Sequence, residues 1–140
     1  MTKTQEILSK IIKNQKHDIP LDKKLAFKDL ARISNNLPDD IFTDNCCIWS
    51  GYITNLNTEK KNCYISFFFK KKKVSLNRLL YCNFIGPLND NEYIKYTCNN
   101  KGKCCSINHM KKVHEDNNEN YVIKNINKEK KNSNKLRVSF

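Results

Sequence analysis

The chain has 140 residues, of which 26 are Lys or Arg and 14 are Asp or Glu, so its formal net charge is +12. This length allows one compact domain plus tails, and a hydrophobic share of 39% predicts a small core. No apolar run is long enough to cross a bilayer and the polar first residues are not a secretion signal, which argues against a membrane protein or a secreted one. We therefore expect an intracellular protein in a reducing compartment: the host cytoplasm or nucleus, or the virion, if the protein is viral.

The first 40 residues predict a layer of two amphipathic helices. Residues 4–15 and 22–35 each repeat apolar side chains at helical spacing, and Pro20 interrupts the chain between them. The two apolar faces consist of Ile7, Leu8, Ile11 and Ile12, and of Leu25, Ala26, Leu30 and Ile33. Residues 37–40 read as a turn or linker that follows this layer. The helices themselves indicate no specific function.

A β-hairpin followed by a helix is predicted in the middle of the chain. Residues 48–53 are strand-like, and residues 63–69 alternate between two faces. One face carries Cys63, Ile65, Phe67 and Phe69, and the other carries Tyr64, Ser66 and Phe68. Ser75 can cap a helix over residues 76–85, which Gly86 would end in a left-handed conformation and Pro87 cannot continue.

Four consecutive lysines form the tip of this hairpin, namely Lys70, Lys71, Lys72 and Lys73. They are either a solvated turn that keeps a hydrophobic hairpin from aggregating or phosphate contacts beside a DNA-facing strand, and both interpretations can hold together. The large positive charge favours a polyanionic partner, because Lys and Arg displace counterions from phosphates. The abundance of Lys, Asn and Ile is typical of A/T-rich coding DNA, but it does not explain the deficit of acidic residues. Nucleic acid is therefore favoured over acidic membranes or proteins.

The last third of the chain begins with a predicted strand at residues 93–97. This strand leads into a cysteine-rich loop, and a short helical stretch is expected after His109. A tail rich in Asn, Lys and Glu begins near Asn117. Within it, residues 121–126 and 136–140 have the composition of edge strands, and residues 121–140 as a whole form a basic C-terminal tail.

The loop at residues 98–110 carries the most specific chemistry. It reads Cys-Asn-Asn-Lys-Gly-Lys-Cys-Cys-Ser-Ile-Asn-His-Met, and zinc is typically held by a tetrahedron of such thiols and imidazoles. Seven cysteines in a reducing compartment argue for metal binding or free thiols rather than disulfides. The candidate ligands are, in chain order, Cys46 or Cys47, Cys98, Cys104 or Cys105, and His109. Cys63 and Cys82 are interpreted as small buried hydrophobes.

Three blocks of sequence carry a family resemblance. Residues 47–51, Cys-Ile-Trp-Ser-Gly, are similar to a Cys-x-Trp-Thr-Gly opening, and residues 77–81 with 84–88 resemble a His-Arg-Leu-Ala-Tyr helix with a Val-Gly-Pro-Ile exit. Residues 96–98 and 104–110 resemble the pair His-x-Cys and Cys-x-Asn-Pro-x-His-Leu. In this order, the blocks resemble the His-Me finger homing endonucleases, the HNH and His-Cys box enzymes of phages, introns and large viruses. The likeness covers residues 46–118.

The resemblance implies an α+β fold with a small zinc-stabilised ββα core, His-Me finger-like, at residues 41–120. Residues 1–40 would be the helical layer on this core, and 121–140 the tail. Carried over residue by residue, the zinc ligands would be Cys47, Cys98, Cys104 and His109, with Cys46 or Cys105 as alternates. The partner would be double-stranded DNA, contacted through the lysine tip and Arg78, and a homodimer is expected by resemblance.

The catalytic positions of the family are only partly matched. The general base of these enzymes falls on Tyr96, and a phenol with a pKa near 10 is a poor base at neutral pH. The Mg²⁺ ligand would be Asn117, with Asn118 as the register alternative, and His114 is the nearby imidazole that would serve as a substitute base. The loop between Cys98 and Cys104 is longer than in the family and must bulge at Gly102. The family's Pro and helix His are replaced by Ile107 and Asn77.

Three functions are compatible with these features. The first is a zinc-stabilised DNA-binding protein that derives from such an endonuclease and has lost its catalysis. The second is an active Mg²⁺-dependent DNA endonuclease with a relocated base. The third is a zinc-stabilised structural subunit that binds another protein. A nicking assay with and without Mg²⁺ separates the second from the others.

Overall fold

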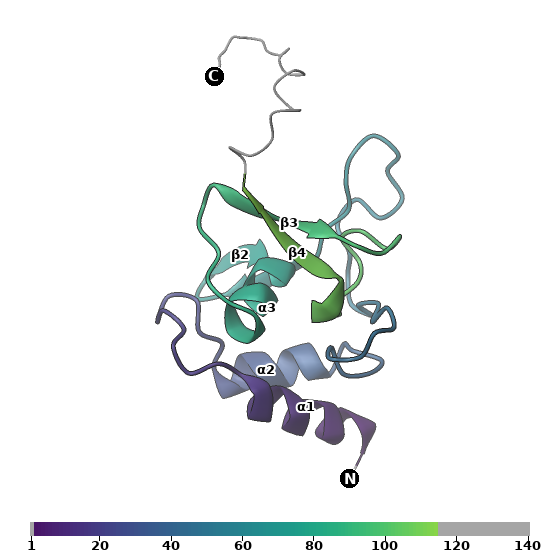
Figure 1. Cartoon of the computed structure of the whole chain (residues 1–140). Helices are drawn as coiled ribbons and strands as arrows, with labels where there is room; N and C mark the ends of the chain where they lie inside the picture. Colours follow the sequence, from purple (N-terminus) through teal and green to yellow (C-terminus); the bar gives the residue numbers. More distant parts are fainter. Residues whose placement is uncertain (1, 115–140) are drawn as a thin grey trace. The chain divides into compact units, whose positions relative to one another are not determined.

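The computed structural model describes residues 2–114 and mixes helices with small antiparallel sheets, so the expected α+β class is confirmed (Figure 1). The described residues divide into two compact units, 2–88 with 94–111, and 89–93 with 112–114. Within the described residues, no helix combines the length and apolar content needed to cross a membrane. The predicted edge strands and basic tail beyond residue 114 lie outside the described residues.

Helix α1 (Lys3–Asn14) forms where its sequence predicts a helix, but it begins one residue earlier than the predicted range and leaves Ile12 of the predicted apolar face exposed. The Oγ1 atom of Thr2 accepts a hydrogen bond from the backbone N–H of Gln5 at 3.2 Å, and the Gln5 side chain accepts one from the N–H of Thr2 at 2.9 Å. This reciprocal capping satisfies backbone donors that have no partner within the helix. The helix buries Ile7 and Ile11.

Helix α2 (Phe27–Ser34) begins later than its pattern predicts. The N–H groups of Lys23 and Lys24 both donate to the carbonyl of Pro20, which makes a separate turn before the helix. The helix starts where the Asp29 carboxylate accepts from the N–H of Ala26 at 2.9 Å. It buries Leu30 and Ile33, and it lies alongside α1 in Figure 1.

Strands β1 (Ser66–Phe69) and β2 (Lys72–Ser75) form the predicted hairpin. They pair antiparallel, with Phe67 opposite Val74 and Phe69 opposite Lys72. The expected alternation holds, because Phe67 and Phe69 are buried whereas Phe68 is exposed. The two turn residues, Lys70 and Lys71, both have positive φ angles, 51° and 70°, the geometry of a tight two-residue hairpin turn.

The predicted strand at residues 48–53 is not formed as a strand. Ile48 and Thr54 each make only an isolated bridge, to Cys104 and to Tyr64 respectively. One end of this extended segment pairs with the cysteine loop and the other with the start of the hairpin. It therefore has no continuous partner along its length.

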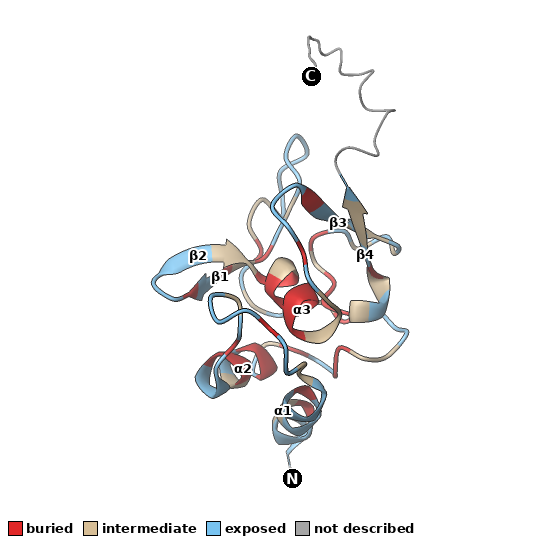
Figure 2. Cartoon of the chain, turned by 60° about the vertical axis from the view of Figure 1, so that its left-hand side comes forward, coloured by how far each residue is buried: buried red, intermediate tan, exposed pale blue. Residues whose placement is uncertain are grey.

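Helix α3 (Leu76–Phe84) is the central element of the larger unit. Ser75 caps it, with its hydroxyl accepting from the N–H of Arg78 at 3.4 Å. Figure 2 shows α3 as largely buried, whereas α1 and α2 each keep an exposed side. The prediction that Gly86 takes a left-handed conformation is wrong. Its N–H and that of Ile85 both donate to the carbonyl of Tyr81, which ends the helix without a positive φ.

Strands β3 (Glu92–Tyr96) and β4 (Met110–His114) form the second sheet, and the short 3-10 helix η1 (Ile107–His109) lies directly before β4. The helical stretch predicted after His109 is therefore wrong, because this segment is a strand. The N–H of Thr97 donates to the carbonyl of His109 at 3.0 Å, which aligns the two segments at the start of their pairing. Pairing with β3 overrides the helix-compatible composition of the segment.

Candidate metal centre

Four side chains converge at the end of the β3–β4 sheet. Cys46, Cys98, Cys104 and His109 each offer one ligand atom, and these four atoms all lie within 4.8 Å of one another. Cys46 is exposed, Cys104 is buried, and the other two are intermediate. The cluster thus has a solvent-facing edge and a side that reaches into the protein.

Local backbone structure explains why the loop ligands meet. Cys98 lies two residues after the end of β3, and the chain then turns back so that the N–H groups of Lys103 and Cys104 both donate to the carbonyl of Asn100 at 3.1 Å. Helix η1 then places His109 beside the same turn, because its N–H donates to the carbonyl of Ser106. One tight turn and one 3-10 turn therefore present three ligands to a common point.

The distances fit a tetrahedral ion. The Nδ1 atom of His109 lies 3.7 Å from the sulfur of Cys46 and 3.5 Å from the sulfur of Cys104. Zinc bonds of about 2.3 Å to sulfur and about 2.0 Å to nitrogen, at the tetrahedral angle, place those two atoms about 3.5 Å apart. The donor set of three thiols and one imidazole is one of the usual structural zinc sets. The cluster therefore fits a metal ion such as zinc.

The hydrogen bond on the far side of the imidazole favours metal binding. The Nε2 atom of His109 lies 2.8 Å from the backbone carbonyl of Asp44. A carbonyl only accepts hydrogen bonds, so Nε2 must carry the proton. In a neutral imidazole with this tautomer, the lone pair of Nδ1 is directed at the thiols, the arrangement that orients metal-bound histidines in proteins.

Backbone N–H groups surround the buried thiol. The N–H groups of Cys47 and Ser106 both donate to the sulfur of Cys104 at 3.4 Å. Burial raises the pKa of the Cys104 thiol to about 11, and these two bonds oppose the rise. At the exposed edge, a hydrogen bond from Asn100 lowers the pKa of Cys46. A bound cation would complete the stabilisation of the Cys104 thiolate that the N–H groups begin.

The structure brings Cys46, and not Cys47, to the cluster. Cys47 is 1% exposed, and its sulfur donates to the carbonyl of Asp39 at 3.2 Å. Cys105 is fully buried and lies in the hydrophobic core. Neighbouring residues of an extended segment point to opposite sides, so only one member of each cysteine pair can face the ion. The N–H of Cys105 donates to the carbonyl of Cys47 at 2.7 Å, which aligns the two pairs.

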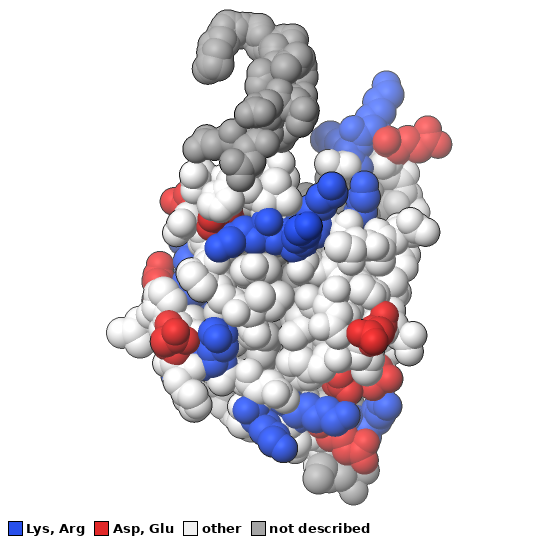
Figure 3. Space-filling model, viewed as in Figure 1, with Lys and Arg blue, Asp and Glu red and all other residues white. Residues whose placement is uncertain are grey.

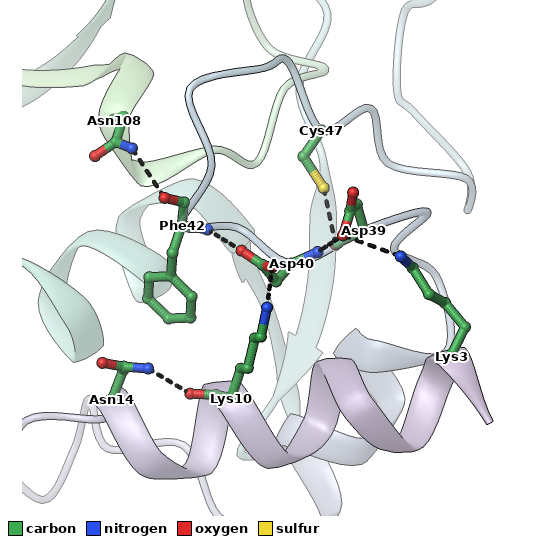
Figure 4. Close-up of polar contacts among 8 residues, drawn as sticks. All are labelled: Lys3, Lys10, Asn14, Asp39, Asp40, Phe42, Cys47 and Asn108. Carbon is green, nitrogen blue, oxygen red and sulfur yellow. Dashed lines mark hydrogen bonds and ion pairs between the residues drawn. The ribbon is translucent and has the colours of Figure 1, made fainter. Parts of the chain in front are cut away.

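The segment that leads to Cys46 makes polar contacts with helix α1 and with Asn108 of the 3-10 helix η1 (Figure 4). On one side, Lys10 of α1 lies 3.0 Å from the carboxylate of Asp40, which is 5% exposed. On the other side, the side-chain amide of Asn108 donates to the carbonyl of Phe42 at 3.1 Å. Residues on both flanks thus fix the segment that delivers Cys46 and the Asp44 carbonyl.

The longer loop does bulge at Gly102. This residue has a φ of +78°, and a Cβ atom there would collide with the carbonyl oxygen of Cys63. The thiol of Cys63 in turn donates to the carbonyl of Lys101 at 3.2 Å. The loop therefore packs directly on the chain before β1, and only glycine fits at the contact.

Sequence reasoning missed the structural role of Asn77. This side chain is 2% exposed, and its amide donates to the carbonyl of Cys104 at 2.9 Å. It therefore ties α3 to the metal loop. The signal was present, because Asn77 occupies the position of a conspicuous histidine in the resemblance, but that comparison suggested a lost function rather than a structural one.

Neither Tyr96 nor His114, the described residues at candidate catalytic positions, belongs to the four-residue cluster. Tyr96 is partly buried, and burial followed by the neighbouring thiols of Cys105 and Cys104 raises its pKa well above the usual range. In the second unit, Nε2 of His114 lies 3.0 Å from the carboxylate of Glu92. A hydrogen bond from the N–H of Asn89, followed by the charges of Lys112 and His114, lowers the pKa of that carboxyl. Asn117 and Asn118 lie outside the described residues.

The basic residues predicted to bind nucleic acid separate into different settings. Lys70 and Lys71 form the hairpin turn, Lys72 and Lys73 belong to β2, and Arg78 lies half-buried on α3. Figure 3 shows further Lys and Arg side chains gathered on the face where β3 and β4 run.

Comparisons with known proteins identify one viral relative. The chain is 48% identical over 128 residues to an uncharacterized protein of Acanthamoeba polyphaga mimivirus, an alignment that covers 91% of this chain and 37% of that protein. The chain thus spans little more than a third of the length of the curated relative it matches. The likeness supports a viral origin. No protein-family profile and no solved structure matches the chain.

Proposed function

We propose that this chain is a zinc-stabilised DNA-binding protein whose core is related to the His-Me finger endonucleases and which no longer cleaves DNA. The observation that carries the proposal is the Cys3His cluster, formed by a loop between two strands and by an upstream segment. The order of these parts agrees with the order of the three sequence blocks. The viral relative is consistent with the phages, introns and large viruses in which such enzymes occur.

Zinc would have a structural role in this protein. Four protein ligands complete a tetrahedron, so no coordination position remains for water or substrate. The ligands come from Cys46, from the turn at residues 98–104 and from η1, and an ion would hold these three segments together. A small hydrophobic core benefits from such a cross-link.

DNA is the partner that the charge supports best. The net charge of +12 includes the hairpin lysines and the lysines of the face shown in Figure 3. Among the ion pairs of the described residues, none involves Lys70, Lys71, Lys72 or Lys73, so their charges are available to phosphates. Phosphate contacts of this kind supply affinity without sequence specificity.

The loss of catalysis rests on the residue at the position of the base. Tyr96 stands where the related enzymes have histidine, and a phenol does not accept a proton from water at neutral pH. Its side chain is partly buried and packs against the hydrophobic core. A Tyr96→His variant that gained nicking activity would indicate descent from an enzyme.

A gel-shift titration tests DNA binding directly. The full chain, loaded with zinc, is expected to bind a labelled duplex with an affinity that falls steeply between 50 and 200 mM salt. A Lys71→Gln, Lys73→Gln double variant should show a shallower salt dependence, whereas the Lys13→Gln control on α1 should resemble the wild type. Absence of a shift at low salt would refute the proposal.

An active endonuclease is the second candidate, and the pairing of His114 with Glu92 favours it. Glu92 is 3% exposed, and its ionised carboxylate can orient the imidazole as acidic residues orient catalytic histidines. Mg²⁺ would then be held by Asn117 or Asn118. Nicking of supercoiled plasmid that requires Mg²⁺ and is lost in His114→Ala and Asn117→Ala would establish this function and overturn the first.

A further inference from the structure

A basic cavity shares no lining residue with the metal cluster. Its volume is about 490 Å³, and it is lined by the hairpin, by α3 and by the turn that precedes α2. Small-molecule sites typically enclose about 300–1,000 Å³. The cavity is therefore large enough for a compact ligand and much larger than a phosphate ion needs.

Cations dominate the polar part of the lining. Lys23, Lys70, Lys72 and Arg78 contribute positive charge, and Asp22 is the one carboxylate among the lining residues. Among the described residues, neither Lys23 nor Lys72 takes part in an ion pair. Such a lining favours an anion with more than one negative oxygen.

The remaining wall is apolar. Phe69, Val74, Leu79 and Leu88 line it, and Phe69, Leu79 and Leu88 belong to the buried core. Lys70 fixes one edge, because its ammonium donates to the carbonyl of Leu21 at 2.8 Å and lies 5.5 Å from the centre of the Phe69 ring. A lining that combines apolar side chains with a group of cations suits a ligand with one apolar, planar part and one anionic part.

The register of the hairpin explains which lysine faces the cavity. Phe69 pairs with Lys72 and Phe67 pairs with Val74, so Lys72 and Val74 project from the face that carries the buried aromatic rings. Lys73 pairs with the exposed Phe68 and projects from the opposite face. Lys72 therefore lines the cavity, whereas the adjacent Lys73 lies on the opposite face of the hairpin.

We infer that this cavity binds a nucleotide unit, with its phosphate among Lys23, Lys72 and Arg78 and its base against the apolar wall. Two sources share this chemistry, namely a free nucleoside monophosphate and the 5′-phosphorylated end of a nucleic-acid strand. The inference goes beyond duplex binding and does not depend on it. A protein that binds no duplex can still bind a nucleotide here.

Isothermal titration of the zinc-loaded full chain with AMP tests the inference. We expect AMP to bind at least tenfold more tightly than either adenosine or inorganic phosphate, because each of these fills only half of the site. The Lys72→Gln variant should weaken AMP binding about tenfold, as expected for the loss of one charge-assisted hydrogen bond. The Lys73→Gln variant removes the same charge from the neighbouring residue and should change AMP affinity less than twofold.

Three outcomes would overturn the inference: no binding of AMP at millimolar concentration, equal binding of AMP and inorganic phosphate, or equal losses in Lys72→Gln and Lys73→Gln. Thermal melting of both variants confirms that each is folded, and a Lys23→Gln variant supplies a second test of the same cavity. Duplex gel shifts of the same proteins test DNA binding separately, so the absence of a nucleotide site can be distinguished from the absence of the proposed DNA-binding function.

Two oligonucleotides of one sequence identify the source of the nucleotide. If a 5′-phosphorylated strand displaces AMP and its 5′-hydroxyl counterpart does not, the cavity accepts strand ends. If neither displaces AMP, the cavity accepts free nucleotides alone. Either result supports a nucleotide site, provided that the Lys72→Gln variant has lost the binding.

Discussion

The metal-cluster region and the N-terminal helical layer are both attached to α3, but by different interactions. Asn77 reaches from α3 to the carbonyl of Cys104, where backbone polar bonds and a candidate ion hold the loop. Asn83, near the other end of α3, contacts the segment before α2, where apolar burial dominates. One helix thus organises this small protein through two buried amides, each facing a region with a different source of stability.

Metal removal should have the largest effect, and it should disrupt the metal-cluster region while leaving the N-terminal helical layer folded. A strong chelator, or the Cys98→Ala variant, is expected to remove about one zinc ion per chain and to unfold the loop, since structural zinc in small domains contributes about 10 kcal/mol of binding free energy. Elemental analysis and near-ultraviolet circular dichroism measure both effects.

The matched control is Cys82→Ala, because Cys82 is a buried cysteine of α3 outside the cluster. This variant should retain one zinc ion. Equal zinc content in Cys98→Ala and in the wild type would contradict the assignment of the ligands.

Gly102→Ala should have the next largest effect on stability, again in the metal-cluster region. The new Cβ would collide with the carbonyl of Cys63, and the positive φ disfavours alanine, so we expect a loss of about 3 kcal/mol or more in the free energy of unfolding. Gly86→Ala is the control, because nothing lies within 4 Å of its Cβ position. Urea denaturation measures both, and equal midpoints would show that the bulge is not required.

Asn83→Ala tests the helical side. The Asn83 side chain accepts from Gln15 and from the N–H of Leu25, and it donates to the carbonyls of Lys23 and Leu79. Removing this fully bonded, buried amide leaves its four partners without their hydrogen bonds. The free energy of unfolding should therefore fall by about 2–4 kcal/mol. Zinc content should stay unchanged, and the exposed Asn57→Ala variant serves as the control. A variant that lost zinc would show that the two regions are coupled.

The smallest expected effect concerns the junction of the two regions. A hydrogen bond from the N–H of Asp40, followed by the ammonium of Lys3, lowers the pKa of Asp39 (Figure 4). A lowered carboxyl pKa stabilises the folded state above the ordinary value near 4, and this contribution is lost as the pH falls through the folded pKa. Asp39→Asn should therefore lower the melting temperature slightly at pH 7 and not at pH 2.5. An equal change at both pH values would exclude this ionisation as the cause.

Local patterns predicted the parts of the fold that local interactions determine. The helical face of α1, the alternation through Phe67 and Phe69, and the cap at Ser75 all depend on spacing within a few residues. Local composition predicts helix for the β4 segment, because its pairing with β3 across the cysteine loop is not visible within a few residues. The start of α2 was placed too early because the turn at Pro20 uses helix-like hydrogen bonds without continuing into the helix.

In the candidate site, too, local sequence predicted some features whereas others depend on the fold. Cysteine and histidine spacing located the cluster, but it did not decide between Cys46 and Cys47, because both adjacent thiols satisfy the same spacing. That choice depends on the hydrogen bond between Cys105 and Cys47, and on the burial of the Cys47 side chain. The division of the hairpin lysines between two faces also required the strand register.

The turn at Lys70 and Lys71 has a consequence for the chemistry of the hairpin. Both residues adopt a backbone handedness that L-amino acids disfavour by roughly 1–2 kcal/mol each. Their mirror-image isomers favour that handedness and carry the same ammonium groups. Chemically synthesised protein with D-lysine at both positions would therefore keep its charge while relieving the strain, which makes chirality a means of separating electrostatics from folding at this tip.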